Sequence, residues 1–283
     1  MKSITVELDH ITLGGLSFGA SDKPVLLALH GWLDNAASFI PLASYLQDYH
    51  IIAIEWPGHG HSNHRAAGAS YHLADYVYDL YAISEYFKTE YQCTSLSIIA
   101  HSLGGIVASM FAGTFTEKVE RLVLIESFGP MTAPAADCTS ILKKSIVQKT
   151  REGTKPMPVH PTLASAINAR ANAGDVEHNT AKWLVERGSV AVAGGYTWRS
   201  DARLRTLSPI RLSEAQALQF FESITAPTLS ILGEGTMLDT SEIIANRMSR
   251  VANLHTMRIA GGHHVHMEQP EKIAQAIGEF LKQ

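Results

Sequence analysis

The sequence predicts an α/β fold built on a mostly parallel sheet. Five short, continuous apolar runs are spread along the 283 residues, and such runs are typical of strands that are covered on both faces. Segments with the three- and four-residue apolar repeat of helices lie between them. Strand alternating with helix favours right-handed crossovers, which leave helices on both sides of a parallel sheet. The runs are Val25–Leu29, Ile51–Ile54, Leu96–Ala100, Leu122–Ile125 and Thr228–Leu232.

The remaining elements are predicted in chain order around these runs. Apolar and polar residues alternate in Ile4–Leu8, and Ile11–Phe18 follows after a short turn, so we expect a half-exposed antiparallel start to the sheet. The helical repeat is clear over Leu73–Phe87. Near the end, the sequence predicts a helix around 241–250, an alternating strand at Leu254–Ile259 and a last helix beginning at Pro270, a favoured first helical residue.

One long segment interrupts this rhythm. From Pro130 to Thr225, 96 residues contain no convincing strand, and helical stretches are expected near 138–152, 162–173 and 178–188. We therefore predict a core in two parts, 1–129 and 226–283, with a helical cap inserted at 130–225.

Composition limits the classes of partner. The chain is 46% apolar and 18% charged, which suits a globular protein with a large core and excludes a disordered chain or a coiled coil. With 23 basic and 27 acidic residues the net charge is −4, so we expect neither nucleic acid nor a membrane as partner. A small-molecule substrate and a monomer or homodimer are expected instead.

Cellular location and metal content are predicted from the termini and the cysteines. The first residues lack the apolar core of a signal peptide, and no later stretch is long and apolar enough for a membrane span. Cys93 and Cys138 form no disulfide framework and have no metal-ligand spacing. The expected location is cytoplasmic.

The strongest functional signal surrounds Ser102. An apolar strand, Ile98–His101, leads into this serine, and a helical pattern follows it. A serine on a strained strand-to-helix turn requires small residues two positions before and after it, and Ala100 and Gly104 meet that requirement. Because the turn places the hydroxyl at a helix N-terminus, where negative charge is stabilised, Ser102 is the predicted nucleophile.

A serine nucleophile needs a base to accept its proton. Of the 14 histidines, His263 follows the last predicted strand and should lie at the same sheet edge as Ser102. We expect packing or surface roles for its neighbours His264 and His266. The histidines beside glycines or beside the nucleophile are expected to form loop hydrogen bonds: His30, His59, His61 and His101.

Together these motifs resemble the α/β-hydrolase superfamily, in its serine hydrolase-like branch with a helical cap. The resemblance runs through His30-Gly-Trp32, Pro57-Gly-His-Gly-His-Ser62, the Ser102 turn and the Gly262-His263 loop with Glu268 and Pro270 behind it. It implies an eight-stranded, mostly parallel sheet flanked by helices. It also implies an oxyanion hole made by the backbone N–H groups of Trp32 and Leu103. No cofactor and no metal are implied, because the triad supplies nucleophile, base and electrostatic stabilisation itself.

The third member of the triad departs from the common pattern. Many members of the superfamily place an aspartate three residues after the glycine that closes the seventh strand, but here that glycine is Gly233 and the third residue on is Thr236. Glu126, directly after the sixth strand, is the preferred acid, as in haloalkane dehalogenase-like branches, and it keeps the Ser, acid, His order. Asp239 and Glu234 remain alternatives.

The predicted reaction is hydrolysis of a small, largely apolar carboxylic ester through an acyl-enzyme. Carbon–carbon bond hydrolysis of a β-diketone-like substrate is the nearest enzymatic alternative, because it can use the same triad. A ligand-sensing protein on a hydrolase scaffold is the alternative from another class. The cap aromatics either line an apolar pocket or form the core of the cap, and the cap arginines either bind a substrate carboxylate or lie at the surface. The aromatics are Trp183, Tyr196, Trp198, Phe220 and Phe221, and the arginines are Arg199, Arg203 and Arg205.

Overall fold

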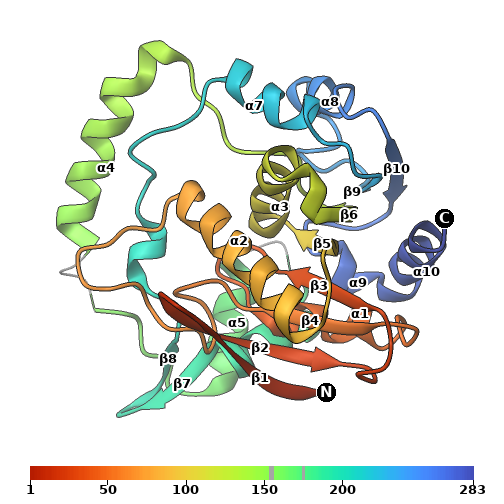
Figure 1. Cartoon of the computed structure of the whole chain (residues 1–283). Helices are drawn as coiled ribbons and strands as arrows, with labels where there is room; N and C mark the ends of the chain where they lie inside the picture. The colour runs from red at the N-terminus through yellow and green to blue at the C-terminus, as the bar shows by residue number, and fades with distance from the viewer. Residues whose placement is uncertain (153–155, 174–175) are drawn as a thin grey trace.

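The computed structural model describes residues 1–152, 156–173 and 176–283, which are arranged around one large sheet (Figure 1). The sheet has eight strands. In spatial order they are β1 (Lys2–Leu8), β2 (Ile11–Phe18), β4 (His50–Ile54), β3 (Val25–Leu29), β5 (Leu96–His101), β6 (Val119–Ile125), β9 (Thr228–Gly233) and β10 (Leu254–Ile259).

Strand direction follows the prediction. β2 pairs antiparallel with both β1 and β4, whereas all pairs from β4 to β10 are parallel. The alternating N-terminal segments thus form an antiparallel edge, and the continuous apolar runs form the parallel centre. An eight-stranded, mostly parallel sheet is confirmed.

Each parallel strand contributes to two cores because its side chains alternate between the faces of the sheet. In β3, Leu27 and Leu29 belong to one buried cluster, and Leu26 and Ala28 belong to the other. Both faces are therefore apolar, which is why these strands are uninterrupted apolar runs in the sequence.

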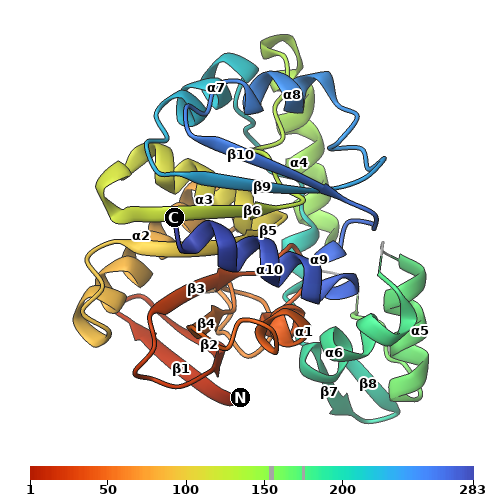
Figure 2. The same cartoon turned by 90° about the vertical axis from the view of Figure 1, so that its right-hand side faces the viewer.

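Helices cover both faces. On one face lie α2 (Leu73–Glu90), α3 (Leu103–Thr114) and α8 (Glu242–Met248), with the short η2 (Thr116–Lys118) after α3. On the other, which is toward the viewer in Figure 2, lie η1 (Ala36–Phe39), α1 (Ile40–Ala43), α9 (Val265–Glu268) and α10 (Pro270–Leu281). No helix in the described ranges is long and apolar enough to cross a membrane.

The segment 130–225 is mainly helical, as predicted, but the expectation that it holds no strand is wrong. β7 (Ser189–Val192) and β8 (Gly195–Trp198) pair as an antiparallel hairpin. Gly194 and Gly195 have φ of 88° and 141°, which only glycine adopts readily at such a turn. The other elements are η3 (Ala135–Asp137), α4 (Cys138–Glu152), α5 (Leu163–Ala173), α6 (His178–Gly188), η4 (Ala202–Arg205) and α7 (Glu214–Glu222).

These inserted elements fall into three parts. The helices α5 and α6 and the β7–β8 hairpin lie together as one lobe, whereas α4 runs along the outside of the molecule (Figures 1 and 2). The helix α7 packs on α3, and Phe221 stacks on Phe128 with ring centroids 4.9 Å apart. We propose that α7 belongs with the core although it falls inside the predicted cap range.

Candidate active site

The predicted nucleophile lies at the tight junction between β5 and α3. Ser102 has φ 48° and ψ −115°, a conformation that a residue with a side chain adopts only under strain. The turn leaves no room for a side chain at Gly104, where a Cβ atom would lie 2.3 Å from the carbonyl oxygen of Leu29. This close approach explains the requirement for a small residue that the sequence pattern indicated.

The structure brings Ser102, His263 and Glu126 into one hydrogen-bonded chain. His263 Nε2 lies 2.9 Å from Ser102 Oγ, and its Nδ1 lies 3.3 Å from Glu126 Oε2. The tautomer that satisfies both contacts carries its proton on Nδ1, donates it toward the carboxylate and leaves Nε2 as acceptor for the serine hydroxyl. This is the arrangement in which an imidazole can act as a general base.

Sheet register explains why Ser102 and Glu126 meet. His101 and Ile125 are paired in the parallel ladder between β5 and β6, so the next residue of each strand emerges at the same edge. Both of these next residues, Ser102 and Glu126, have positive φ, 48° and 46°. The two chains turn out of the sheet side by side.

Glu126 is held by its second oxygen. The residue is 1% exposed, and Oε1 accepts from the backbone N–H of Gly233 at 2.6 Å and from the hydroxyl of Thr236 at 3.2 Å. These two donors come from the end of β9 and leave Oε2 directed at His263. Thr236 stands at the position where many members of the superfamily have an aspartate.

The two alternative acids lie elsewhere. Asp239 pairs with Arg258 and accepts from the backbone N–H of Gly235 at 3.2 Å, and the hydrogen bond from Arg258 lowers the pKa of this carboxyl. Glu234 is exposed at the rim of the pocket. Within the described residues, neither carboxylate forms a hydrogen bond to His263.

The two predicted oxyanion donors have free N–H groups. Leu103 is the first residue of α3, where a helix leaves its N–H groups unpaired. Neither its N–H nor that of Trp32 donates to a protein group in the described part of the chain. The indole of Trp32, 51% exposed, turns away and donates to the carbonyl of Leu204 at 3.0 Å.

His30 holds the loop that carries Trp32. Its carbonyl accepts from the N–H of Gly104 at 3.1 Å and from the indole of Trp56 at 3.0 Å, and its Nε2 accepts from the Trp56 N–H at 3.1 Å. Burial lowers the pKa of His30, which favours the neutral ring that can accept at Nε2. His30 therefore forms loop hydrogen bonds, as predicted.

A cavity of about 730 Å³ opens over Ser102, Glu126 and His263. The loops after β6, β9 and β10 provide most of its lining. The apolar side chains around it are Ile106, Phe128, Met131, Met237 and Leu238. Such a pocket suits an apolar group attached to a reacting carbonyl.

The cap residues suggested for substrate contact lie outside this lining. Arg203 binds both carboxylate oxygens of Asp201 and three backbone carbonyls, so its guanidinium has a structural role. Arg199 donates to the carbonyl of Ser189 at 3.0 Å. The lining, as far as the described residues form it, contains none of the five aromatics or of the three arginines discussed above.

Three side chains around the catalytic loops were missing from the sequence predictions: the buried Asp34 and the half-buried Arg170 and Thr236. His264 is also more than a packing residue, because its Nε2 lies 3.0 Å from Asp34 Oδ2. The signal for Asp34 was its place in His30-Gly-Trp-Leu-Asp34, in the loop that carries the predicted oxyanion donor Trp32. Arg170 lies on a helix 136 residues away and had no such local signal.

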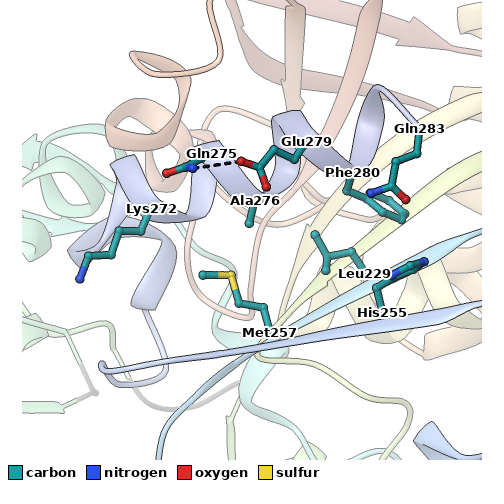
Figure 3. A pocket seen from close by; sticks show the side chains of 9 residues that line it. All are labelled: Leu229, His255, Met257, Lys272, Gln275, Ala276, Glu279, Phe280 and Gln283. Atoms are coloured by element: carbon teal, nitrogen blue, oxygen red, sulfur yellow. Dashed lines mark hydrogen bonds between the residues drawn. The ribbon is translucent and has the colours of Figure 1, made fainter.

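A second hollow, of about 430 Å³, lies between β9, β10 and α10 (Figure 3). Lys272, Gln275 and Glu279 line it from α10, and Gln275 donates to Glu279 at 3.0 Å. It shares no lining residue with the cavity over Ser102. The cavity that brings Ser102, His263 and Glu126 together is therefore the one at the carboxyl ends of the strands.

Comparison with known proteins identifies the family of this chain. The family described as alpha/beta hydrolase fold matches residues 24–270. Serine hydrolase-like protein of Danio rerio is 28% identical over 281 residues, which cover 95% of this chain and 85% of that protein. Serine hydrolase-like protein 2 of Homo sapiens is 27% identical, with 94% and 89% covered.

Solved structures show the same fold. A hypothetical protein of Pseudomonas aeruginosa PAO1 has a TM-score of 0.94 and 36% identity, with all of both chains covered. A thioesterase domain from the curacin biosynthetic pathway has a TM-score of 0.83 over 98% of both chains, and at 23% identity it supports the fold alone. With most of its length matched, this chain belongs to the α/β-hydrolase family, in its serine hydrolase-like branch.

Proposed function

We propose that the protein is a carboxylic-ester hydrolase that acts through an acyl-enzyme on Ser102. The observation that carries this proposal is the hydrogen-bonded chain from Ser102 through His263 to Glu126, which ends in an apolar cavity. A hydrolase fold can host other chemistry, so the proposal rests on this site and not on the family name.

In the proposed reaction, His263 takes the proton of Ser102 while the serine oxygen attacks the ester carbonyl. The N–H groups of Trp32 and Leu103 stabilise the oxyanion that forms, each donor being worth about 10²–10³ in rate. His263 then gives its proton to the departing alcohol, and the ester bond breaks. Water, activated by the same histidine, attacks the acyl-serine, releases the acid and restores Ser102.

The cavity favours neutral acyl groups. Its described lining includes two carboxylates besides the apolar side chains, Glu126 and Glu234, and neither lysine nor arginine. An anionic substrate would meet like charge there without a compensating cation. We therefore propose short to medium apolar acyl groups as the substrate class.

The test is turnover of p-nitrophenyl butyrate by wild type and Ser102→Ala. We expect the variant to lose several orders of magnitude in kcat/KM, because no other group replaces the nucleophile. Ser127→Ala is the matched control, since that neighbouring hydroxyl donates to the Ser102 carbonyl at 2.7 Å and not to His263. Unchanged turnover by Ser102→Ala would refute the proposal.

A fluorophosphonate separates the enzyme from a ligand-sensing protein. Covalent labelling of wild type and none of Ser102→Ala shows an activated nucleophile. A wild-type Ser102 that resists labelling would favour the binding protein. A panel of p-nitrophenyl esters with butyrate, octanoate and hemisuccinate acyl groups then tests the substrate class, with the anionic hemisuccinate expected to be the poorest.

A further inference from the structure

A buried carboxylate outside the Ser102–His263–Glu126 chain joins three segments that surround the site. Asp34 is 2% exposed and lies in the loop after β3, two residues beyond Trp32. Its Oδ1 accepts from the guanidinium of Arg170 on α5 at 2.8 Å, and its Oδ2 lies 3.0 Å from Nε2 of His264. One side chain thus links the oxyanion loop, the catalytic-histidine loop and the cap lobe.

The contacts of Asp34 are of the strong, charge-assisted kind. Burial by itself would raise the pKa of this carboxyl, but His264 and Arg170 hold it well below its usual value. Asp34 is therefore ionised at neutral pH. A buried ionic contact of this kind is costly to break on one side, because the remaining charge is left without a partner.

The loop that carries the base is held at two successive residues. His101, next to the nucleophile, contacts the carbonyl oxygen of His263 through Nε2 at 2.8 Å. Asp34 holds the following residue, His264, from the side of the oxyanion loop. The backbone of His263 is thus fixed between the nucleophile strand and the loop that carries Trp32.

We propose that Asp34 is a positioning residue, which sets the placement of the Trp32 N–H relative to His263, and that Arg170 holds Asp34 in place from the cap. The catalytic part of this inference rests on the proposed ester hydrolysis. A shift of either loop changes the geometry that the tetrahedral intermediate meets, while the apolar side chains that line the cavity come from α3 and from the loops after β6 and β9. The effect is therefore expected in kcat more than in KM.

A second ion pair on the same lobe provides the matched control. Arg187, at the end of α6, binds both oxygens of Glu55 at 2.7 and 2.9 Å, and Glu55 is fully buried. This pair also ties the cap lobe to the core. Within the described residues, Glu55 forms no hydrogen bond to the catalytic-histidine loop, 261–268.

The experiment compares Asp34→Asn, Arg170→Met, the double variant and Arg187→Met, with active sites titrated and Tm measured for each. We expect Asp34→Asn to lose about 10² in kcat, the value of one oxyanion donor, with KM within about threefold. The affinity of phenylboronic acid, which forms a tetrahedral adduct on the serine, should fall in parallel. Arg170→Met should lose about tenfold in kcat, and the double variant should be no worse than Asp34→Asn because both residues act through one contact.

The control Arg187→Met distinguishes an effect on the position of the catalytic loops from a general loosening of the cap lobe. Arg187→Met should lower Tm as much as Arg170→Met but keep kcat and boronate affinity within about twofold of wild type. If Arg187→Met loses kcat to the same extent, or if the losses of Asp34→Asn and Arg170→Met multiply, the proposal is overturned. The same holds if Asp34→Asn changes Tm and leaves kcat per active site unaltered.

Hydrogen–deuterium exchange tests the positioning without any substrate. Peptides covering 261–268 should exchange faster in Asp34→Asn and Arg170→Met than in wild type and Arg187→Met, because the anchor of His264 is weakened. Unchanged exchange in this loop would contradict the role of Asp34. This readout does not depend on turnover. If the wild type hydrolysed no ester, the proposed function would be refuted, but the exchange experiment would still test whether Asp34 positions this loop.

Discussion

The ends of β6 and β9 lie next to each other and could each supply an acid, yet only one of them does so in this structure. β6 ends in Glu126, whose carboxylate reaches Nδ1 of His263 at 3.3 Å. The end of β9 presents Thr236, whose hydroxyl donates to that same carboxylate. One strand end carries the acceptor, and the other carries a donor that holds it.

The difference shows that the strand from which a carboxylate comes is less important for contact with His263 than where its oxygen lies in the fold. The peptide N–H of Gly233 and the hydroxyl of Thr236 bind one oxygen of Glu126, so the other oxygen faces the imidazole. With an aspartate at 236 beside Glu126, two carboxylates would crowd the site, and like charges at such a distance disfavour each other's ionisation. A hydroxyl at position 236, after β9, is therefore compatible with a carboxylate at position 126, after β6.

The largest expected effect comes from Glu126→Gln. We expect a loss of about 10⁴ in kcat for p-nitrophenyl butyrate, by analogy with the loss of the orienting acid in serine proteases. Asp239→Asn is the control and should stay within about twofold, since Asp239 is occupied by Arg258. The opposite ranking of the two variants would assign the acid to β9 and reverse the comparison.

A smaller effect is expected when the acid is moved from one strand end to the other. In the background Glu126→Gln, the change Thr236→Asp should recover about 10-fold to 10²-fold of the lost kcat, because a carboxylate at 236 starts from a site already in contact with residue 126. Thr236→Asn in the same background has the same shape without the charge. Equal recovery by Asp and Asn would show that charge at 236 does not reach His263.

The smallest effect concerns the donor alone. Thr236→Val keeps the volume and removes the hydroxyl, so we expect about a tenfold decrease in kcat, in line with the loss of about 1.5 kcal/mol for a hydrogen bond to a charged group. Thr240→Val, a neighbouring threonine whose hydroxyl donates to the Thr236 carbonyl at 3.1 Å, is the matched comparison and should keep kcat within about twofold of wild type.

Most of the fold was predictable because a strand that is buried on both faces of a sheet has a recognisable sequence pattern. A central strand such as β3 has no polar face and is recognised as an uninterrupted apolar run. The tight turn at Ser102 was predictable for a related reason, since it requires small neighbours such as Gly104. These features depend on local geometry, which the order of residues determines directly.

What was not predictable depends on contacts between distant segments. Which acid faces His263 depends on how the ends of β6 and β9 lie relative to the last loop, and the pattern left Asp239 and Glu234 as alternatives to Glu126. The contact of Arg170 with Asp34 joins residues far apart in the chain, and no local sequence pattern near either residue predicts that they pair. The β7–β8 hairpin did have a local signal, a glycine pair between alternating β-branched and aromatic residues, which the dominance of helix in the insert obscured.

Two ion pairs, Arg170 with Asp34 and Arg187 with Glu55, tie the α5–α6 lobe to the core. The described lining of the cavity comes from other parts of the chain, so this lobe can stay in place while a molecule enters. Two exposed thioethers flank the cavity, Met131 and Met237, the latter 82% exposed. Methionine side chains change rotamer in picoseconds to nanoseconds, whereas domain opening takes microseconds or longer. Among the described residues, the cavity over Ser102 is therefore bordered by two side chains that rearrange quickly and by none from the α5–α6 lobe.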